Sequence, residues 1–600
     1  MHGHLKVEEH FSKTSQDAGY LCFDITDLLG FLRRSPTVTG IQRVQLEATR
    51  AVLAQSHQKA MCCFFSHERH WQIVDGQVFC EVFDDYTNAA PGWETRLKAF
   101  LDSTLKAPTF EFSPGDTLLC LGATWNIPGL FESFRELQFE GVSCVFYIHD
   151  LLPLTHPEYF EGNHVVRFGY WFFNVLSVAD GLICNSNETR DAVLQLSEFS
   201  GPVEVVDLNI QSTFNRSVPD DRDDGHLAKR NPITRPVSQK SSVLVRHALE
   251  QQDYVLMVGT LEPRKNHITA LHVWVALNKA LGDRCPKLVI VGKTGWHSDG
   301  IVAHLETLNR HGKVVWIQDA TDRDLAVLYE KCLCTLYLSR GEGWGLPVSE
   351  ALGAGKPVVC GKNSCAEHAT QGLAFVVDEC SERDVINTLL DLFTNKQKLI
   401  ERGDLIQTTA SFGSWADFGN QIQRLALGLR PKETKRRLRE VSIDRSYCFG
   451  HQASFDELDM NCFADNLLWG NGWHKPENWG VWTNRASGEL RFALPDNCSF
   501  DVYLYFIAPR GAMQVTVRRG TEALVRKGVH KGTLVKAKLE PDPSDPNVTL
   551  KIETDRVSDL SADDSTTDRR TLGFGLCEVR FVRSDDLLGR LEALERFVQL

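Results

Sequence analysis

Two glutamates eight positions apart lie in one Gly-rich segment, SRGEGWGLPVSEALGAGKPVV (339–359). The segment follows an apolar run that predicts a strand, turns through several glycines, and enters a predicted helix near Leu346, with Pro347 in its first turn. Glu342 therefore lies on the turn and Glu350 about one turn into the helix. Carboxylates accept hydrogen bonds from sugar hydroxyls, and the free N–H groups at such a helix start favour a phosphate. The alternative is a solvated loop carboxylate and a charge on an exposed helix face.

A second segment, VGTLEPRKNH (258–267), also runs from a predicted strand end into a predicted helix. Arg264 and Lys265 stand side by side in its turn, where two cations could neutralise a diphosphate leaving group. The alternative is a pair of solvated basic side chains. Positive charges at a helix amino end oppose the helix dipole, which weakens that alternative.

Together these segments resemble the retaining glycosyltransferases of family 4. The resemblance rests on GTLEPRKNH, VGKTGW (291–296) and GEGWGLPVSEALGAGKPVV, in that order. In the first half, TGIQRV (39–44) and FYIHDLLPLTHPEYF (146–160) resemble segments of the mannosyltransferase-like members. The likeness covers about residues 20 to 430 and implies a GT-B fold, in which two Rossmann-like domains face each other.

The resemblance implies roles for particular residues. Lys265, with Arg264 beside it, would hold the donor diphosphate, and Glu350 would accept hydrogen bonds from the nucleotide ribose. Glu342 would lie beside the donor sugar. Further positions near the donor would be the backbone N–H groups of Gly343, Gly345 and Leu346, together with Gly40, which lets the first domain approach the phosphates, and Thr260. His149 would lie between the domains, close to the transferred sugar, either as a catalytic group or as a structural histidine.

The sequence departs from the family pattern at two places. Thr260 stands where many relatives carry an arginine, so Arg264 would have to compensate for the missing charge. Cys365-Ala366-Glu367 replaces the usual Ser-Pro-Glu, and Glu367 is therefore not assigned to the site. The resemblance implies no cofactor beyond the nucleotide-sugar, and no Asp-x-Asp metal signature stands at a credible strand end, so no metal is expected.

The elements that must position these residues follow from hydrophobic patterning. Continuous apolar runs alternate with helical patterns in two stretches, which predicts two parallel sheets covered by helices, an α/β architecture. The expected strands are 20–26, 60–66, 117–122, 142–148, 181–184 and 203–208 in the first stretch, and 254–260, 287–293, 313–319, 334–339, 357–361 and 374–378 in the second.

Four segments are expected along the chain. Residues 1–214 form an acceptor-side Rossmann-like domain, 215–246 a linker rich in Pro, Asp and Arg, and 247–430 a nucleotide-sugar-binding Rossmann-like domain. Residues 431–600 carry short alternating strands, typical of an antiparallel β-sandwich, and end in a helical pattern. That last helix caps the sandwich or mediates self-association.

The predicted sandwich begins with a Trp-rich segment, LLWGNGWHKPENWGVWTNRASGELRF (467–492), which looks like a domain often joined to bacterial polysaccharide glycosyltransferases. Its tryptophans, which are Trp469, Trp473, Trp479 and Trp482, either stack on sugar rings or form the sandwich core. The sequence favours neither interpretation.

Composition excludes several classes of protein. Apolar residues at 42% and charged residues at 24% are typical of globular proteins, and the net charge of −13 favours no nucleic-acid partner. The 17 cysteines lack framework spacing, which favours a reducing compartment. The amino terminus shows no secretory signal, so we expect a cytoplasmic protein, peripheral to the inner membrane if the basic run 432–440 contacts lipid. The oligomeric state is not predicted.

The expected function is transfer of a hexose from a nucleotide-sugar to a growing surface polysaccharide or lipid-linked oligosaccharide. GDP-mannose is the favoured donor, because TGIQRV and EPRKN resemble the motifs of mannosyltransferases, while UDP-sugars and dTDP-rhamnose stay open. The alternative is a non-catalytic glycan-binding or scaffold protein that keeps the GT-B fold. A glycogen-synthase-like enzyme is a third option. A phosphorylase is disfavoured, since no segment resembles a pyridoxal-phosphate lysine site.

Overall fold

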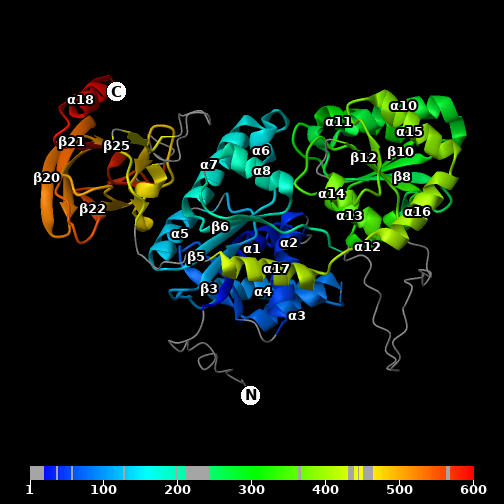
Figure 1. Cartoon of the computed structure of the whole chain (residues 1–600), viewed down its shortest axis with the longest axis horizontal. Helices are drawn as coiled ribbons and strands as arrows, with labels where there is room; N and C mark the ends of the chain where they lie inside the picture. Colours follow the sequence, from blue (N-terminus) through cyan, green and yellow to red (C-terminus); the bar gives the residue numbers. More distant parts are fainter. Residues whose placement is uncertain are drawn as a thin grey trace, which may run out of the picture.

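The computed structural model describes residues 19–210, 242–429, 438–450 and 464–599, apart from short gaps at 36–37, 39, 56–58, 89, 126, 128, 198, 363–365, 444 and 562–567. Figure 1 shows three units in a row, with the amino-terminal α/β unit in the middle. The predicted linker lies largely outside the described residues, as do Thr39 of the TGIQRV motif and most of the basic run 432–440.

The first unit is built on a seven-stranded sheet of order β3-β2-β1-β4-β5-β6-β7. Its strands are β1 (Leu21–Asp24), β2 (Ala60–Phe65), β3 (Trp71–Val74), β4 (Thr117–Cys120), β5 (Ser143–Ile148), β6 (Gly181–Cys184) and β7 (Val203–Val205). Its helices are α1 (Thr26–Leu32), α2 (Ile41–Leu53), α3 (Gly76–Thr87), α4 (Trp93–Ser103), α5 (Leu130–Phe139), α6 (Leu152–Thr155), α7 (Gly162–Val178) and α8 (Asn187–Leu196). All six predicted strands are present. The edge strand β3, which pairs antiparallel with β2, was not predicted.

The second unit contains a six-stranded parallel sheet of order β10-β9-β8-β11-β12-β13. Its strands are β8 (Tyr254–Val258), β9 (Lys287–Val291), β10 (Val314–Ile317), β11 (Cys334–Tyr337), β12 (Val358–Gly361) and β13 (Phe375–Val377). Its helices are α9 (Ser242–Arg246), α10 (His267–Leu281), α11 (Asp299–Arg310), α12 (Asp322–Lys331), α13 (Leu346–Gly353), α14 (Ala366–Thr370), α15 (Glu382–Thr394) and α16 (Gln397–Thr409). The predicted α/β class with two Rossmann-like units is confirmed.

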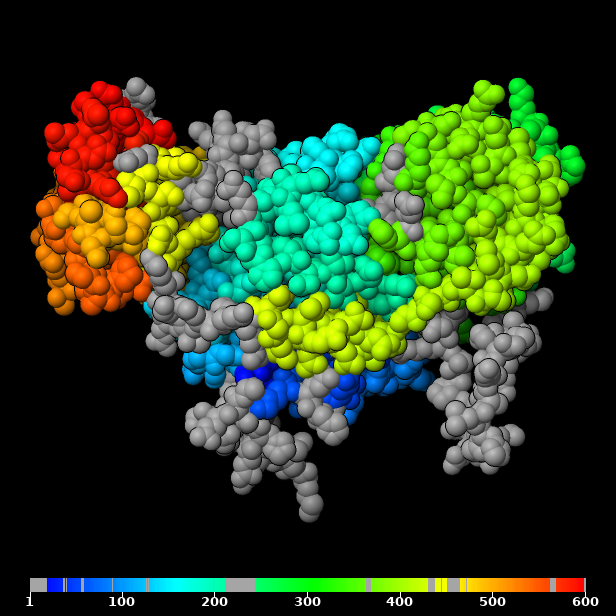
Figure 2. Space-filling view, in the orientation of Figure 1, coloured from blue at the N-terminus to red at the C-terminus, as the bar shows by residue number. Residues whose placement is uncertain are grey.

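One helix differs from the predicted division of the chain. The predicted second domain ran to residue 430. In the structure, α17 (Trp415–Gly428) instead packs on α2 and against β1, β4 and β6 of the first sheet. Phe418, Ile422 and Ala426 form the buried face that makes this contact. Figures 1 and 2 show the helix, in yellow, lying across the first unit. After α16 the chain therefore returns to the first unit. The polypeptide thus connects the two units twice.

The third unit has two packed antiparallel sheets, β14-β25-β18-β21 and β15-β17-β22-β19-β20, with β16 pairing to β25. The strands are β14 (Ser446–Cys448), β15 (Leu468–Trp469), β16 (Val481–Trp482), β17 (Ser487–Ala493), β18 (Phe500–Ile507), β19 (Met513–Arg519), β20 (Glu522–Val529), β21 (Lys531–Leu539), β22 (Asn547–Thr554) and β25 (Gly575–Arg583), with the separate pair β23 (Ser558–Asp559) and β24 (Thr571–Leu572). The predicted antiparallel region is confirmed.

The four tryptophans of the third unit divide into two kinds. Trp473 belongs to the sandwich core and Trp469 is buried against Phe139 of α5, so both are structural. Trp479 and Trp482 are only partly buried and pack on each other, with ring centroids 4.6 Å apart. The core interpretation therefore holds for Trp473, while Trp469 is buried at the contact between the sandwich and the first unit.

The terminal helix α18 (Leu587–Gln599) caps the sandwich through Ala593 and Phe597, which pack against Tyr503 and Val582. Its other face exposes leucines at positions 587, 588, 591 and 594. Among the described helices, none is long and apolar enough to cross a bilayer.

Candidate active site

The two chemistry-bearing motifs of the second unit meet because their strands are neighbours. β8 and β11 pair in parallel, so their carboxyl ends lie at the same edge of the sheet. β8 leads through Thr260 into the short helix η5 (Pro263–Lys265), and β11 leads into the loop that carries Glu342. The sequence pattern alone places both turns at this edge, and the structure shows that their side chains touch.

A buried ion cluster joins the motifs. The Lys265 Nζ atom and an Arg264 guanidinium nitrogen each lie 2.6 Å from Glu342 Oε1, and the Ser339 hydroxyl donates to the same oxygen. The three charged side chains are only 10–13% exposed. Arg264 also donates to the Gly341 carbonyl at 2.6 Å. This carbonyl fixes the guanidinium against the loop.

The cluster is charged at neutral pH. Burial alone would raise the pKa of Glu342, but Lys265 and Arg264 outweigh it and lower that pKa to about 2. Burial lowers the pKa of Lys265, and the attraction of Glu342 opposes this shift. Because the cations are already held in place and partly desolvated, an anionic ligand that reached them would meet charges needing little reorganisation.

The loop after Glu342 requires glycine for two different reasons. Gly345 precedes α13 with φ of 90°, in the left-handed region, and no side chain caps the helix there. A Cβ on Gly343 would lie 1.9 Å from the His149 carbonyl oxygen of the first unit. No side chain therefore caps the backbone N–H groups of Gly345 and Leu346, while Pro347 has no N–H and the Val348 N–H donates to the Gly345 carbonyl. The loop itself packs directly on the neighbouring unit.

His149 lies at the end of β5, opposite the ion cluster. Its Nε2 is 2.7 Å from the Leu121 carbonyl oxygen, which can only accept, so Nε2 carries a proton. Burial lowers the pKa of His149 to about 4 despite this hydrogen bond. At neutral pH the ring is therefore uncharged, and Nδ1 is left as an acceptor.

Glu350 lies on α13, on the side that faces α2 of the first unit. It accepts a 2.8 Å hydrogen bond from the Tyr329 hydroxyl, and Arg43 lies 3.7 Å from its other oxygen. Arg43 also pairs with Asp322 at 2.7 Å, so one guanidinium contacts two acidic groups of the second unit. Burial raises the pKa of Glu350, and Arg43 opposes that shift.

Sequence reasoning missed several residues of this site. Arg43 and Asp150 both stand inside motifs that the sequence singles out, yet neither was assigned. Asp150 follows His149. Burial raises the pKa of its carboxyl, and the nearby Arg264 and Lys265 partly oppose this shift. Tyr329 and Asp322 carry no sequence signal for this position, because their approach to Glu350 and Arg43 depends on how α12 packs.

The remaining predicted positions are more peripheral. Gly40 caps the amino end of α2 with φ of 52° and ψ of −116°, and nothing lies within 4 Å of where a Cβ would stand. The Thr260 side chain is exposed and lies against Gly295. Neither touches the ion cluster in any described contact. Among the described residues, no group of three or more His, Cys, Asp or Glu side chains is arranged to hold a metal ion.

Part of the second unit matches a known protein family. Residues 244–409 match the family model for glycosyl transferases group 1. The second unit is therefore similar to the glycosyl transferases group 1. The match covers β8 to α16 and therefore includes Arg264, Lys265, Glu342 and Glu350.

The similar curated proteins are mannosyltransferases. The serotype-specific mannosyltransferase WbdA of Escherichia coli is 30% identical over 253 residues, which is 41% of this chain and 29% of that protein. O-antigen chain mannosyltransferase B of Escherichia coli is 29% identical over 217 residues, 36% of this chain and 52% of that one. The chain thus spans less than a third of the length of WbdA.

Solved structures give more distant likenesses. Anabaena Alr3699/HepE in complex with UDP aligns with 68% of this chain and 99% of its own, at 16% identity and a TM-score of 0.44. A trehalose-6-phosphate structure from E. coli with bound UDP-2-fluoro glucose covers 68% of this chain and 99% of its own, at 15% identity and a TM-score of 0.45.

Proposed function

We propose that the protein is a retaining, metal-independent glycosyltransferase that moves a hexose from a nucleotide-sugar onto a growing surface polysaccharide or lipid-linked glycan. The observation that carries this proposal is the buried cluster of Lys265, Arg264 and Glu342 at the edge where the two α/β units meet. It combines fixed positive charge with a carboxylate, the pair of groups that a sugar diphosphate requires.

Donor binding would replace Glu342 as the anionic partner of the two cations. The diphosphate would take over Lys265 and Arg264, assisted by the N–H groups at the start of α13, and Glu342 would then be released to accept hydrogen bonds from the sugar. Glu350 would accept hydrogen bonds from the ribose hydroxyls beside Arg43. GDP-mannose is the favoured donor because the similar curated proteins are named mannosyltransferases.

The transfer step follows from where charge develops. The bond between the anomeric carbon and the diphosphate oxygen breaks, and its electron pair stays on the diphosphate. An acceptor hydroxyl oxygen then forms a bond to the anomeric carbon on the same face, and its proton passes to the departing phosphate oxygen. Lys265 and Arg264 stabilise the negative charge of the leaving group. Neutral His149 offers Nδ1 as an acceptor near the sugar.

The test is a transfer reaction on purified protein. GDP-mannose, UDP-glucose and dTDP-rhamnose are supplied separately with mannose-containing oligosaccharides, in the presence of a metal chelator, and the products are read by proton NMR. We expect product only with GDP-mannose, and we expect the new linkage to keep the α configuration of the donor. Product of inverted configuration, or product that requires a metal ion, would contradict the mechanism. Absence of nucleotide binding in folded protein would support the glycan-binding scaffold instead.

A further inference from the structure

Aromatic side chains from both α/β units meet beside the candidate active site. Trp296 stands in the loop between β9 and α11, and His164 stands near the start of α7. Their rings lie 5.2 Å apart with planes inclined by 32°. Trp296 is 37% exposed, so one part of this large side chain contacts the other unit and another part faces solvent.

The first unit extends this contact into a strip of aromatic side chains, made of Trp296, His164, Phe160 and Trp125. His164 stacks on Phe160 at 5.8 Å with planes inclined by 26°, and Trp125 meets it edge-on at 6.4 Å. Trp125 itself packs on Trp171, which is buried, so the strip stands on a rigid base. A rigid aromatic surface loses little conformational freedom when a ligand covers it.

The strip lies next to the ion cluster. A Cβ on Gly295, the residue before Trp296, would lie 2.7 Å from side-chain atoms of Thr260 and Glu262. Glu262 in turn pairs with Arg264 at 3.4 Å. The loop that carries Trp296 therefore packs directly on the turn that carries the diphosphate-binding cations.

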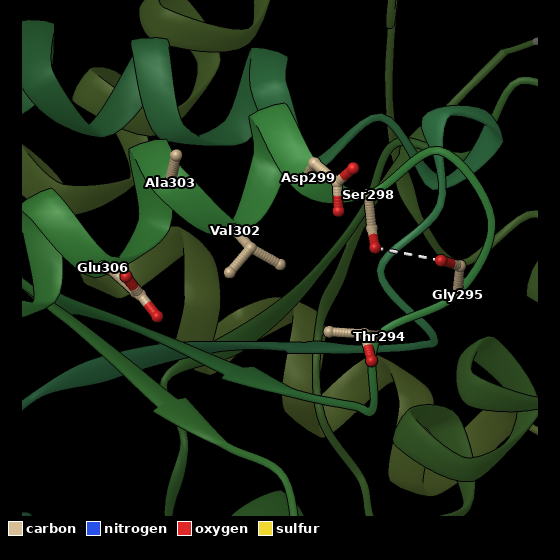
Figure 3. A pocket seen from close by; sticks show the side chains of 7 residues that line it. All are labelled: Thr294, Gly295, Ser298, Asp299, Val302, Ala303 and Glu306. Atoms are coloured by element: carbon tan, nitrogen blue, oxygen red, sulfur yellow. Dashed lines mark hydrogen bonds between the residues drawn. The ribbon is translucent and has the colours of Figure 1, made fainter.

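The same loop also borders a polar cavity. A pocket of about 440 Å³ lies between the loop and α11. Figure 3 shows the side chains of Thr294, Ser298, Asp299 and Glu306 around it. Trp296 does not line this pocket, but its loop carries both features: the hydroxyl and carboxylate groups can accept hydrogen bonds from sugar hydroxyls, and the C–H faces of a sugar pack on aromatic rings.

We propose that Trp296, together with His164 and Phe160, forms a binding subsite for pyranose rings of the acceptor glycan. This inference rests on the proposed glycosyltransferase function. Lys265, Arg264 and Glu350 already account for the phosphates and ribose of a donor, which leaves the strip to the second substrate. Because Trp296 belongs to one unit and His164 to the other, a glycan on the strip also stabilises the contact between the units.

The experiment is calorimetric titration of α-linked mannotriose into the full chain saturated with GDP. Trp296→Ala is expected to weaken mannotriose binding about tenfold, as loss of a central aromatic contact does, and to leave GDP affinity unchanged. Trp296→Phe keeps an aromatic face and should stay within about threefold of wild type. Val376→Ala, which truncates another exposed apolar side chain of the second unit, is the matched control and should change neither affinity.

A second variant tests the other side of the strip. His164→Ala is expected to weaken mannotriose binding by a similar factor, and circular dichroism establishes that each variant is folded. Unchanged mannotriose affinity in Trp296→Ala, or no mannotriose binding by the wild type with GDP bound, would overturn the subsite. If no nucleotide binds but mannotriose binding still depends on Trp296, the proposed transfer reaction fails and the glycan subsite stands.

Discussion

The sheets of the two α/β units present different side chains where the units meet. The second sheet offers a charged edge, with Lys265, Arg264 and Glu342 buried and ionised. The first sheet places a neutral side chain opposite this edge, because His149 donates to a carbonyl and its lowered pKa keeps it uncharged at pH 7, although the Asp150 carboxyl follows it directly. Similar α/β architecture thus supports two chemical tasks, and the difference lies in a few residues at strand ends.

This contrast explains how a charged ligand and a neutral one can share one space. Fixed cations on one side favour a diphosphate, while the neutral His149 opposite them adds no competing positive charge. A neutral imidazole also suits an acceptor whose contacts are hydroxyl groups. The account therefore predicts that donor binding depends on the second unit, with smaller contributions from the first.

Removing a cation from the charged edge should have the largest effect. Lys265→Ala is expected to lower transfer activity roughly 10³-fold, because charge on the leaving group loses a preorganised partner. Initial rates with GDP-mannose measure this loss. Lys362→Ala, which removes an exposed lysine of the same unit from its pair with Asp378, should keep wild-type rates. Equal rates for the two variants would remove the charged edge from the mechanism.

Forcing the two edges apart should have the next largest effect. Gly343→Ala introduces a methyl group against the His149 carbonyl oxygen, so the loop has to move. A displacement of about 1 Å at a reacting centre costs roughly 100-fold in rate. Gly372→Ala is the control, because Gly372 has φ of 73° but open space around it, so strain is added without a clash. Wild-type rates for Gly343→Ala would show that this close contact does not matter for transfer.

The ribose-binding assignment predicts a smaller loss. Glu350→Ala should weaken nucleotide-sugar binding roughly 30-fold, the expected cost of about 2 kcal/mol for hydrogen bonds to a charged group, and leave the fold intact. Calorimetry gives the affinity. Glu330→Ala on α12 removes an exposed carboxylate paired with Lys331 and serves as the control. If Glu350→Ala bound donor like the control, the ribose assignment would be wrong.

The burial of neutral His149 predicts a pH effect on stability. The pKa of His149 is about 4 in the folded chain and about 6.5 when unfolded, so the unfolded chain binds more protons between these values. Stability is therefore lost as the pH falls through this window, by about 2 kcal/mol between pH 7 and pH 5. Denaturant midpoints at the two pH values should show a smaller loss for His149→Gln, whose amide can still donate to Leu121. An equal loss in both proteins would place the titrating group elsewhere.

The sequence predicts much of this arrangement because local rules govern it. Apolar strands and glycine turns place Glu342 and Lys265 at strand ends, and the structure shows that these strands are neighbours and that the two side chains are in contact. Arg43 could have been assigned as well, since it stands in a motif beside Gly40. Pairing of Arg43 with Asp322 depends on packing between helices far apart in the chain, and pairing of Tyr329 with Glu350 depends on how α12 packs beside α13.

Two further differences between the sequence-based predictions and the structure also arise from long-range packing. The sequence places α17 with the preceding helices because nothing in a helical pattern tells which sheet its apolar face covers. Trp469 and Trp479 look alike in a Trp-rich segment, yet one is buried against α5 and the other remains partly exposed. Long-range packing separates such cases, and local patterns carry no information about it.

The most direct test of the charged edge as a donor site is calorimetric titration of the wild-type protein, Lys265→Ala and Lys362→Ala with GDP-mannose, UDP-glucose and dTDP-rhamnose. The account predicts that the wild type binds GDP-mannose selectively, that Lys265→Ala loses this binding, and that Lys362→Ala retains it. Absence of binding to every donor in folded wild-type protein, or unchanged GDP-mannose affinity in Lys265→Ala, would contradict it.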